Sequence, residues 1–143
     1  MKVLSLAGYL GMMGALVGLL YLRSLFSPSW IVITVQVAAL LLLLWARITF
    51  GRRSFHVAAN PTAGGLVMTG PYRYIRHPIY TALCCFTGVA VAAHLSWKTG
   101  LCFAAMLGFA LLRIFCEEKL VSFRYPEYRN YAARTWRMVP YIF

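Results

Sequence analysis

The chain has 143 residues, of which 62% are hydrophobic and only 12% are charged, whereas about 25% are charged in an ordinary soluble domain. This length fits one domain, and so much apolar surface excludes a small soluble globule, which could not bury it. The net charge of +11 comes from basic residues that lie between apolar runs, so it indicates contact with lipid phosphates and excludes a nucleic-acid-binding protein, which carries a clustered basic face.

The first half of the chain contains two apolar runs that are long enough to cross a bilayer. Residues 3–22 carry no charge, and at 1.5 Å per residue a helix of this length matches the roughly 30 Å hydrocarbon core. Residues 27–29, Ser-Pro-Ser, predict a turn. A second span is expected over residues 30–46, opened by the interfacial Trp30 and closed by Arg47.

The second half is predicted to form a loop, a helical hairpin and a tail. Residues 47–77 are rich in Gly and Pro near their middle, which is typical of a loop, and a loop of this length in so small a protein is usually functional. Helices are expected over residues 78–95 and 99–116, with Pro78 at a helix start, where its missing N–H group is not needed. Residues 117–143 then form a polar tail.

The tail itself is predicted to contain a helix that lies on the lipid headgroups. Pro126 breaks the preceding helix, and aromatic and small residues then recur at helical spacing with arginines opposite. The residues of this apolar face are Tyr128, Tyr131, Ala132, Thr135 and Trp136. The apolar residues 139–143 are expected to fold back onto the bundle.

The basic residues predict how the four spans are oriented. With the N-terminus inside, only Arg23 and Lys98 fall on the outer side, so 12 of the 14 basic residues lie on the other side. This distribution obeys the positive-inside rule for four spans. The sequence therefore predicts a single all-α membrane domain over residues 1–143, multi-pass in the cell (inner) membrane, with both termini and any active site on the cytoplasmic side.

The shortage of acids limits the chemistry that the chain can perform. It contains no Asp, and its only acids are Glu117, Glu118 and Glu127. This set excludes a paired-aspartate site, a Ser-His-Asp triad and a carboxylate-rich Mg²⁺ or Ca²⁺ site. No metal site is expected from the cysteines either, because all four lie in apolar stretches without metal-ligand spacing: Cys84, Cys85, Cys102 and Cys116.

Two short stretches carry the residues that could perform chemistry. Residues 70–80 place two Arg, one His and three Tyr directly before a predicted span. An aromatic belt with positive-inside arginines would explain most of them, but not His77. In the second stretch Arg113 and Glu117 share a helix face, either as a simple ion pair or as functional groups at the membrane boundary.

Both stretches fall on the cytoplasmic side of the predicted topology. We therefore predict that His77, Tyr80, Arg113 and Glu117 converge on one site between the third and fourth helices.

These stretches resemble a known family. The string G-P-Y-x-x-x-R-H-P-x-Y over residues 70–80, followed by Arg113 and the pair Glu117-Glu118, is similar to the isoprenylcysteine carboxyl methyltransferase family and the related phospholipid methyltransferases. The resemblance extends from about Gly64 to Phe143 and implies a small prokaryotic-type member. It implies a methyltransferase that uses S-adenosylmethionine, releases S-adenosylhomocysteine, needs no metal and acts on a lipophilic small molecule or lipid. Two positions depart from the family pattern, at Gly64 and in the tail before Tyr128.

The resemblance also assigns roles to individual residues. It implies that Arg113 is a catalytic residue that binds the methyl acceptor, which could be a carboxylate, a thiol or an amine. A thiol or an amine would need a general base, for which His77 is the first candidate and Glu118 the second. The implied cofactor-binding residues are Gly64, Gly65, Leu66, Val67, Tyr72, His77, Pro78, Ile79, Tyr80 and Glu117.

Three questions stay open on the sequence alone. Sterol reductases share an Arg-His-Pro-x-Tyr segment and an ending like residues 140–143, so an NADPH-dependent membrane reductase is an alternative. A non-enzymatic membrane subunit is a second alternative. The oligomeric state is unknown, because Gly11, Gly14 and Gly18 in the first helix could pack against another helix of the same chain or of a second copy.

Overall fold

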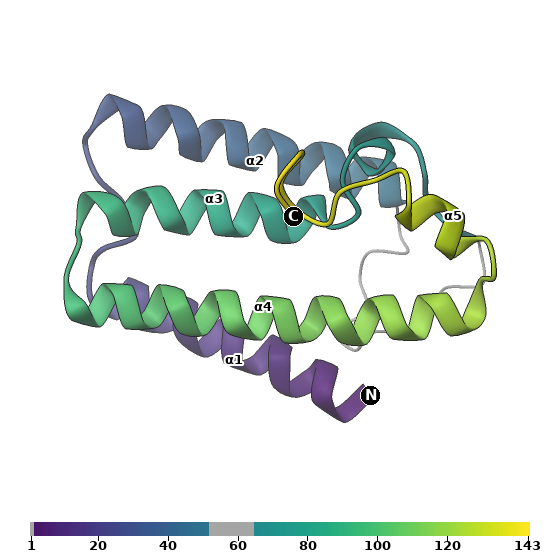
Figure 1. The fold of residues 1–143 in the computed structure, drawn as a ribbon. Coiled ribbons are helices and arrows are strands. Elements are labelled where there is room, and N and C mark those ends of the chain that lie inside the picture. The colour runs from purple at the N-terminus through teal and green to yellow at the C-terminus, as the bar shows by residue number, and fades with distance from the viewer. Residues whose placement is uncertain (1, 52–64) are drawn as a thin grey trace.

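The computed structural model describes residues 2–51 and 65–143 of the chain. Within these residues the secondary structure is helical, apart from one isolated bridge between Ile75 and Trp136. The elements are α1 (Lys2–Tyr21), α2 (Trp30–Phe50), the 3-10 helix η2 (Gly70–Arg73), α3 (Pro78–Ala93), α4 (Trp97–Arg124) and α5 (Tyr128–Ala132). Figure 1 shows the four long helices running along one another, with η2 and α5 gathered at one end.

Three of the long helices have the length and composition of membrane spans, namely α1, α2 and α4. The fourth, α3, is apolar but has only 16 residues. The chain is thus an all-α, multi-pass membrane protein, which confirms the predicted fold class. Two helices run further than predicted, to Phe50 and to Arg124, because Arg and Glu end an apolar run but are themselves good helix formers.

The helices pack chiefly as two pairs, α1 against α4 and α2 against α3. Glycines allow the first pair to approach closely. A Cβ atom on Gly11 would lie 2.5 Å from the ring of Phe109, and one on Gly18 would lie 3.2 Å from Cys102 Sγ. Two of the three glycines with helix-packing spacing therefore serve packing within the chain, whereas Gly14 faces open space.

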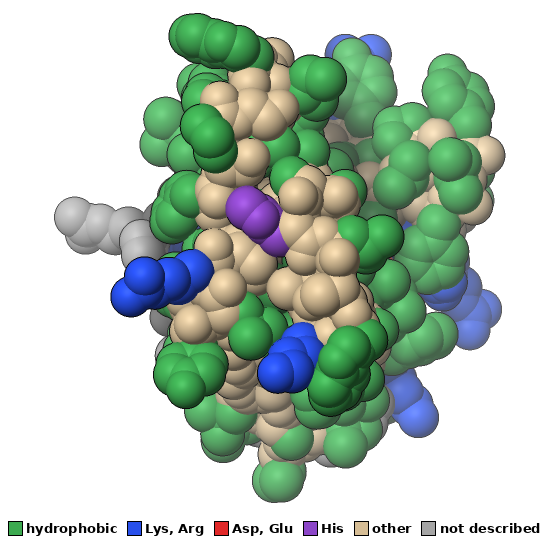
Figure 2. All heavy atoms as spheres, turned by 90° about the vertical axis from the view of Figure 1, so that its left-hand side faces the viewer, with side chains coloured by type: hydrophobic (Ala, Val, Ile, Leu, Met, Phe, Trp, Pro, Cys, Tyr) green, Lys and Arg blue, Asp and Glu red, His purple; other side chains and the backbone are tan. Residues whose placement is uncertain are grey.

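At the end of the bundle away from η2, polar side chains form hydrogen bonds that hold the connections between the helices. Buried Gln36 donates from Nε2 to the carbonyl oxygen of Leu25 at 2.8 Å, and Ser96 caps α4 in a reciprocal pair with Thr99. Figure 2 views the described residues from this end and shows few Lys or Arg and no acidic side chain there. Such a poorly charged end is what the predicted orientation requires of the outer side.

The C-terminal segment corrects the predicted tail. The expected helix reaching Trp136 stops at Ala132, because the following backbone pairs with the segment before α3. The Trp136 N–H donates to Tyr74 O at 3.0 Å, and the Arg76 N–H donates to Trp136 O at 2.7 Å. The end of the chain returns to the core only at Met138, whereas the last residues, Tyr141 and Ile142 among them, are exposed.

Candidate active site

A compact polar cluster lies where the start of α3 meets α4. Arg113 Nε donates to Tyr80 Oη at 2.6 Å and to Glu117 Oε1 at 2.9 Å, and Tyr80 Oη donates to the same Glu117 oxygen at 2.6 Å. Only 7% of the Arg113 side chain is exposed, against 24% of Glu117. The three groups satisfy one another at the edge of the apolar core, which lowers the cost of holding a charged pair there.

His77 joins this cluster from the N-cap position of α3. Its Nε2 atom lies 3.3 Å from Glu118 Oε1, its Nδ1 atom lies 3.9 Å from Glu117 Oε2, and its ring stands 5.8 Å from that of Tyr80. Pro78 fixes this geometry by occupying the first helical position. The predicted convergence of His77, Tyr80, Arg113 and Glu117 is therefore confirmed as geometry, while their roles remain predictions.

Glu118 points to a different set of partners. Its carboxylate accepts from Arg76 Nε at 3.0 Å and from Arg137 Nε at 3.1 Å, besides its contact with His77. Both carboxylate oxygens are thus engaged by guanidinium groups. The other candidate general base, His77, lies between the carboxylates of Glu117 and Glu118.

Arg76 fastens the C-terminal segment to this site. Besides Glu118, its guanidinium donates to the carbonyl oxygens of Ala132 and Thr135 at 2.6 and 2.7 Å, and only 10% of its side chain is exposed. Together with the backbone bonds of residues 74–77, these contacts hold the tail beside His77.

Replacing Arg76 with Gln should release this segment. The change removes the arginine donor from two carbonyl oxygens and one of the partners of the Glu118 carboxylate, at an expected cost of about 2–3 kcal/mol. We expect trypsin to cleave the folded protein faster after Arg129 and Arg134 in this variant. The neighbouring Arg73 is exposed, so Arg73→Gln is the matched control. Equal cleavage rates in both variants would show that Arg76 does not hold the tail.

Tyr72 contacts both the end of α2 and the C-terminal segment. It is buried in η2, its ring stands 5.3 Å from that of Phe50, and its carbonyl oxygen accepts from Tyr131 Oη at 2.7 Å. Burial raises the pKa of Tyr131 to about 12, so the phenol stays protonated and able to donate. Gly70, which begins η2, has a φ of 57°, and a Cβ there would lie 2.5 Å from Thr49 Oγ1. The end of α2 therefore packs directly against η2.

Four further predicted residues lie in the coil before η2 and at the start of α3. Gly65, Leu66 and Val67 are partly exposed in the coil that precedes η2, and Ile79 is partly buried in the first turn of α3. None of these four is among the described side chains that meet at Glu117. Gly64 lies outside the described residues.

Sequence reasoning did not identify two contributors to the site. Tyr9, in α1, places its ring 5.2 Å from Arg113 Cζ. The one signal for it was that it is, with Tyr21, one of two aromatic residues in the otherwise non-aromatic run 3–22. Arg137, in the tail, contacts Glu118 and lies over the rings of Phe115 and Phe143. No spacing rule predicts the contact of Arg137 with α4, because this contact depends on the path of the tail.

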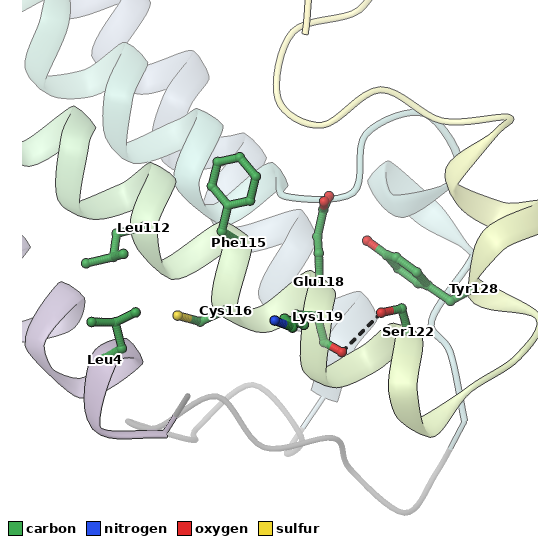
Figure 3. Close-up of a pocket in the computed structure, with 8 residues that line it drawn as sticks. All are labelled: Leu4, Leu112, Phe115, Cys116, Glu118, Lys119, Ser122 and Tyr128. Atoms are coloured by element: carbon green, nitrogen blue, oxygen red, sulfur yellow. Dashed lines mark hydrogen bonds between the residues drawn. The ribbon is translucent and has the colours of Figure 1, made fainter.

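A groove of about 400 Å³ runs along α1 and α4, and Glu118 lines it, whereas Tyr80, Arg113 and Glu117 do not. Figure 3 shows Leu4 and Leu112 facing one another at one end of it, and Glu118 and Tyr128 at the other. The groove is thus apolar at one end and polar at the other. Within residues 2–51 and 65–143, no group of three or more His, Cys, Asp or Glu side chains is arranged to hold a metal ion.

Comparisons with known proteins place this geometry in context. The profile of the isoprenylcysteine carboxyl methyltransferase (ICMT) family matches residues 30–122, which include Tyr80, Arg113 and Glu117. The chain is also 37% identical over 78 residues to the nickel-cobalt-cadmium resistance protein NccN of Alcaligenes xylosoxydans xylosoxydans. This alignment covers 52% of the chain but only 36% of the relative's own length. No solved structure matches the chain.

Proposed function

Because the chain belongs to the isoprenylcysteine carboxyl methyltransferase family, we propose that it is a membrane methyltransferase that uses S-adenosylmethionine to methylate a lipophilic acceptor. We place the reaction on the cytoplasmic side, where the basic residues gather in the predicted topology. The acceptor we favour is an isoprenoid or lipid-like carboxylate. Its chemistry matches a buried arginine better than that of a thiol or an amine does.

The observation that carries this proposal is the contact of Tyr80, Arg113 and Glu117. Glu117 is the more exposed partner of the ion pair with Arg113, and its Oε2 atom lies beyond hydrogen-bond distance of His77. A carboxylate in this position can accept hydrogen bonds from the amino or hydroxyl groups of S-adenosylmethionine. Aromatic faces such as that of Tyr80 attract cations, and the sulfonium is one. The residue types at the cluster thus fit this ligand.

The methyl acceptor would meet the basic part of the same cluster. When bound, S-adenosylmethionine supplies an electrophilic methyl group. Arg113 can grip an acceptor carboxylate with two donors and orient its oxygen, and a carboxylate needs no base. A thiol or an amine would have to lose a proton, which His77 is placed to take. The protein's task is then chiefly positioning in a water-poor site.

The lipophilic part of the acceptor would lie along the groove beside α1 and α4. Its apolar walls include Leu4, Leu112 and Phe115, and Lys119 and Ser122 line its polar end. Membrane lipids would surround the same face, because Phe115 is 58% exposed. An amphiphile could therefore enter this groove from within the bilayer.

Ligand titration tests the proposal against the alternatives. We expect calorimetry on the detergent-purified protein to show binding of S-adenosylmethionine and S-adenosylhomocysteine and none of NADPH. Binding of NADPH alone would favour a reductase. If none of the three ligands bound to a protein whose thermal transition shows that it is folded, a non-enzymatic subunit would be favoured. A Ni²⁺, Co²⁺ and Cd²⁺ titration asks separately whether the resistance role in NccN's name extends to metal binding here.

A further inference from the structure

The family match begins at residue 30, so α1 lies outside it, yet α1 packs against α4 at the candidate site. A Cβ atom on Gly8 would lie 3.1 Å from the carbonyl oxygen of Phe109 and 3.4 Å from Arg113 Cβ. The two backbones therefore approach closely at the turn of α4 that carries Arg113. This approach places the next residue of α1 against the arginine.

That next residue is Tyr9, which covers a face of the Arg113 side chain. Its ring centroid lies 5.2 Å from Arg113 Cζ, within the range of a cation–π contact. Tyr9 is partly buried and packs against the core cluster that contains Met12, Tyr80 and Ile114. This packing holds the Tyr9 ring in a region with little water. A cation–π contact is strongest in such surroundings.

Three residues contact the Arg113 side chain, two at one edge and one at a face. Tyr80 and Glu117 engage its Nε edge, and Tyr9 covers its guanidinium carbon. A planar group held at one edge and at one face has little freedom to rotate. A guanidinium plane of fixed orientation favours bidentate binding of a carboxylate.

We propose that Tyr9 is a positioning residue that orients Arg113 for an anionic acceptor, so that α1 completes the acceptor site. This inference rests on the proposed function, in which Arg113 binds the acceptor. It adds a residue that lies outside the family match, and it predicts a specific effect on ligand binding. Loss of the ring should weaken binding of an anionic acceptor while leaving a neutral analogue of the same size unaffected.

The test compares ligands and variants by calorimetry on protein loaded with S-adenosylhomocysteine. The probes are farnesylthioacetate, a lipophilic carboxylate, and farnesylthioethanol, its neutral counterpart. We expect Tyr9→Leu to raise the dissociation constant of the carboxylate about tenfold and that of the alcohol hardly at all. Tyr9→Phe keeps the ring and should bind both as the wild type does. Tyr21→Leu makes the same change at an exposed position of α1 and should change neither.

Two results would overturn the proposal. The first is Tyr9→Leu binding the carboxylate as tightly as the wild type. The second is a variant that loses affinity for the acid and the alcohol equally, because that pattern indicates a packing role alone. A failure of the proposed function has another signature: S-adenosylhomocysteine does not bind, or Arg113→Lys binds the carboxylate as tightly as the wild type does.

Discussion

Glu117→Gln is expected to weaken the binding of S-adenosylmethionine by about one hundredfold and to abolish methyl transfer at cellular ligand concentrations. Hydrogen bonds to a charged group contribute about 1.5–3 kcal/mol each, and the amide keeps the shape of the side chain but not its charge. The substitution also places a neutral amide beside Arg113 Nε, which in the wild type donates to Glu117 Oε1 at 2.9 Å. Calorimetry and transfer of a radiolabelled methyl group measure the two effects.

The control for this variant is Glu127→Gln. Glu127 is exposed on the turn before α5, so the same change of charge should leave affinity and activity unaltered. If Glu117→Gln bound S-adenosylmethionine as tightly as the wild type, Glu117 would not belong to the cofactor site. The thermal transition of each variant separates a loss of binding from a loss of fold.

Arg113→Lys should produce the second large effect, a fall of about one hundredfold in kcat/KM for a carboxylate acceptor. Lysine keeps the positive charge that balances Glu117 but lacks the planar fork that binds a carboxylate through two donors. The loss should appear mainly as a raised KM for the acceptor, since the interaction lost is one with bound substrate. Steady-state kinetics with farnesylthioacetate and radiolabelled S-adenosylmethionine measure it.

Arg124→Lys is the matched control for this substitution, because Arg124 is exposed at the end of the same helix. It should behave as the wild type. A kcat/KM for Arg113→Lys close to that of the wild type would remove Arg113 from the acceptor site. The geometry would then support only an intrahelical ion pair between Arg113 and Glu117.

Apolar run length and charge placement sufficed to predict the four helices. The uncharged run over residues 3–22 and the Pro78 helix start reappear in the structure as α1 and α3. Convergence at the site was also predictable, because Arg113 and Glu117 share a face of α4 and because His77 and Tyr80 begin α3. Both pairs therefore had to lie at the same end of the bundle.

The tail and the contact of Tyr9 with Arg113 show where sequence reasoning failed, and the physical reason is the same in both cases. Helical spacing from Tyr128 to Trp136 indicated a longer helix, but carbonyl oxygens near its end accept from Arg76, a residue more than fifty positions earlier. Tyr9 meets Arg113 only because Gly8 allows α1 and α4 to approach. Such contacts depend on tertiary packing, and no local spacing rule predicts them.

The most direct test of the proposed shared site is a double-mutant cycle between His77→Asn and Glu117→Gln, measured as the free energy of binding S-adenosylhomocysteine. The two side chains approach to 3.9 Å and come from the N-cap of α3 and from α4. If both contact one ligand, their effects should couple by about 0.5–3 kcal/mol. Additive losses, with both single variants folded and each weakened, would contradict a shared site.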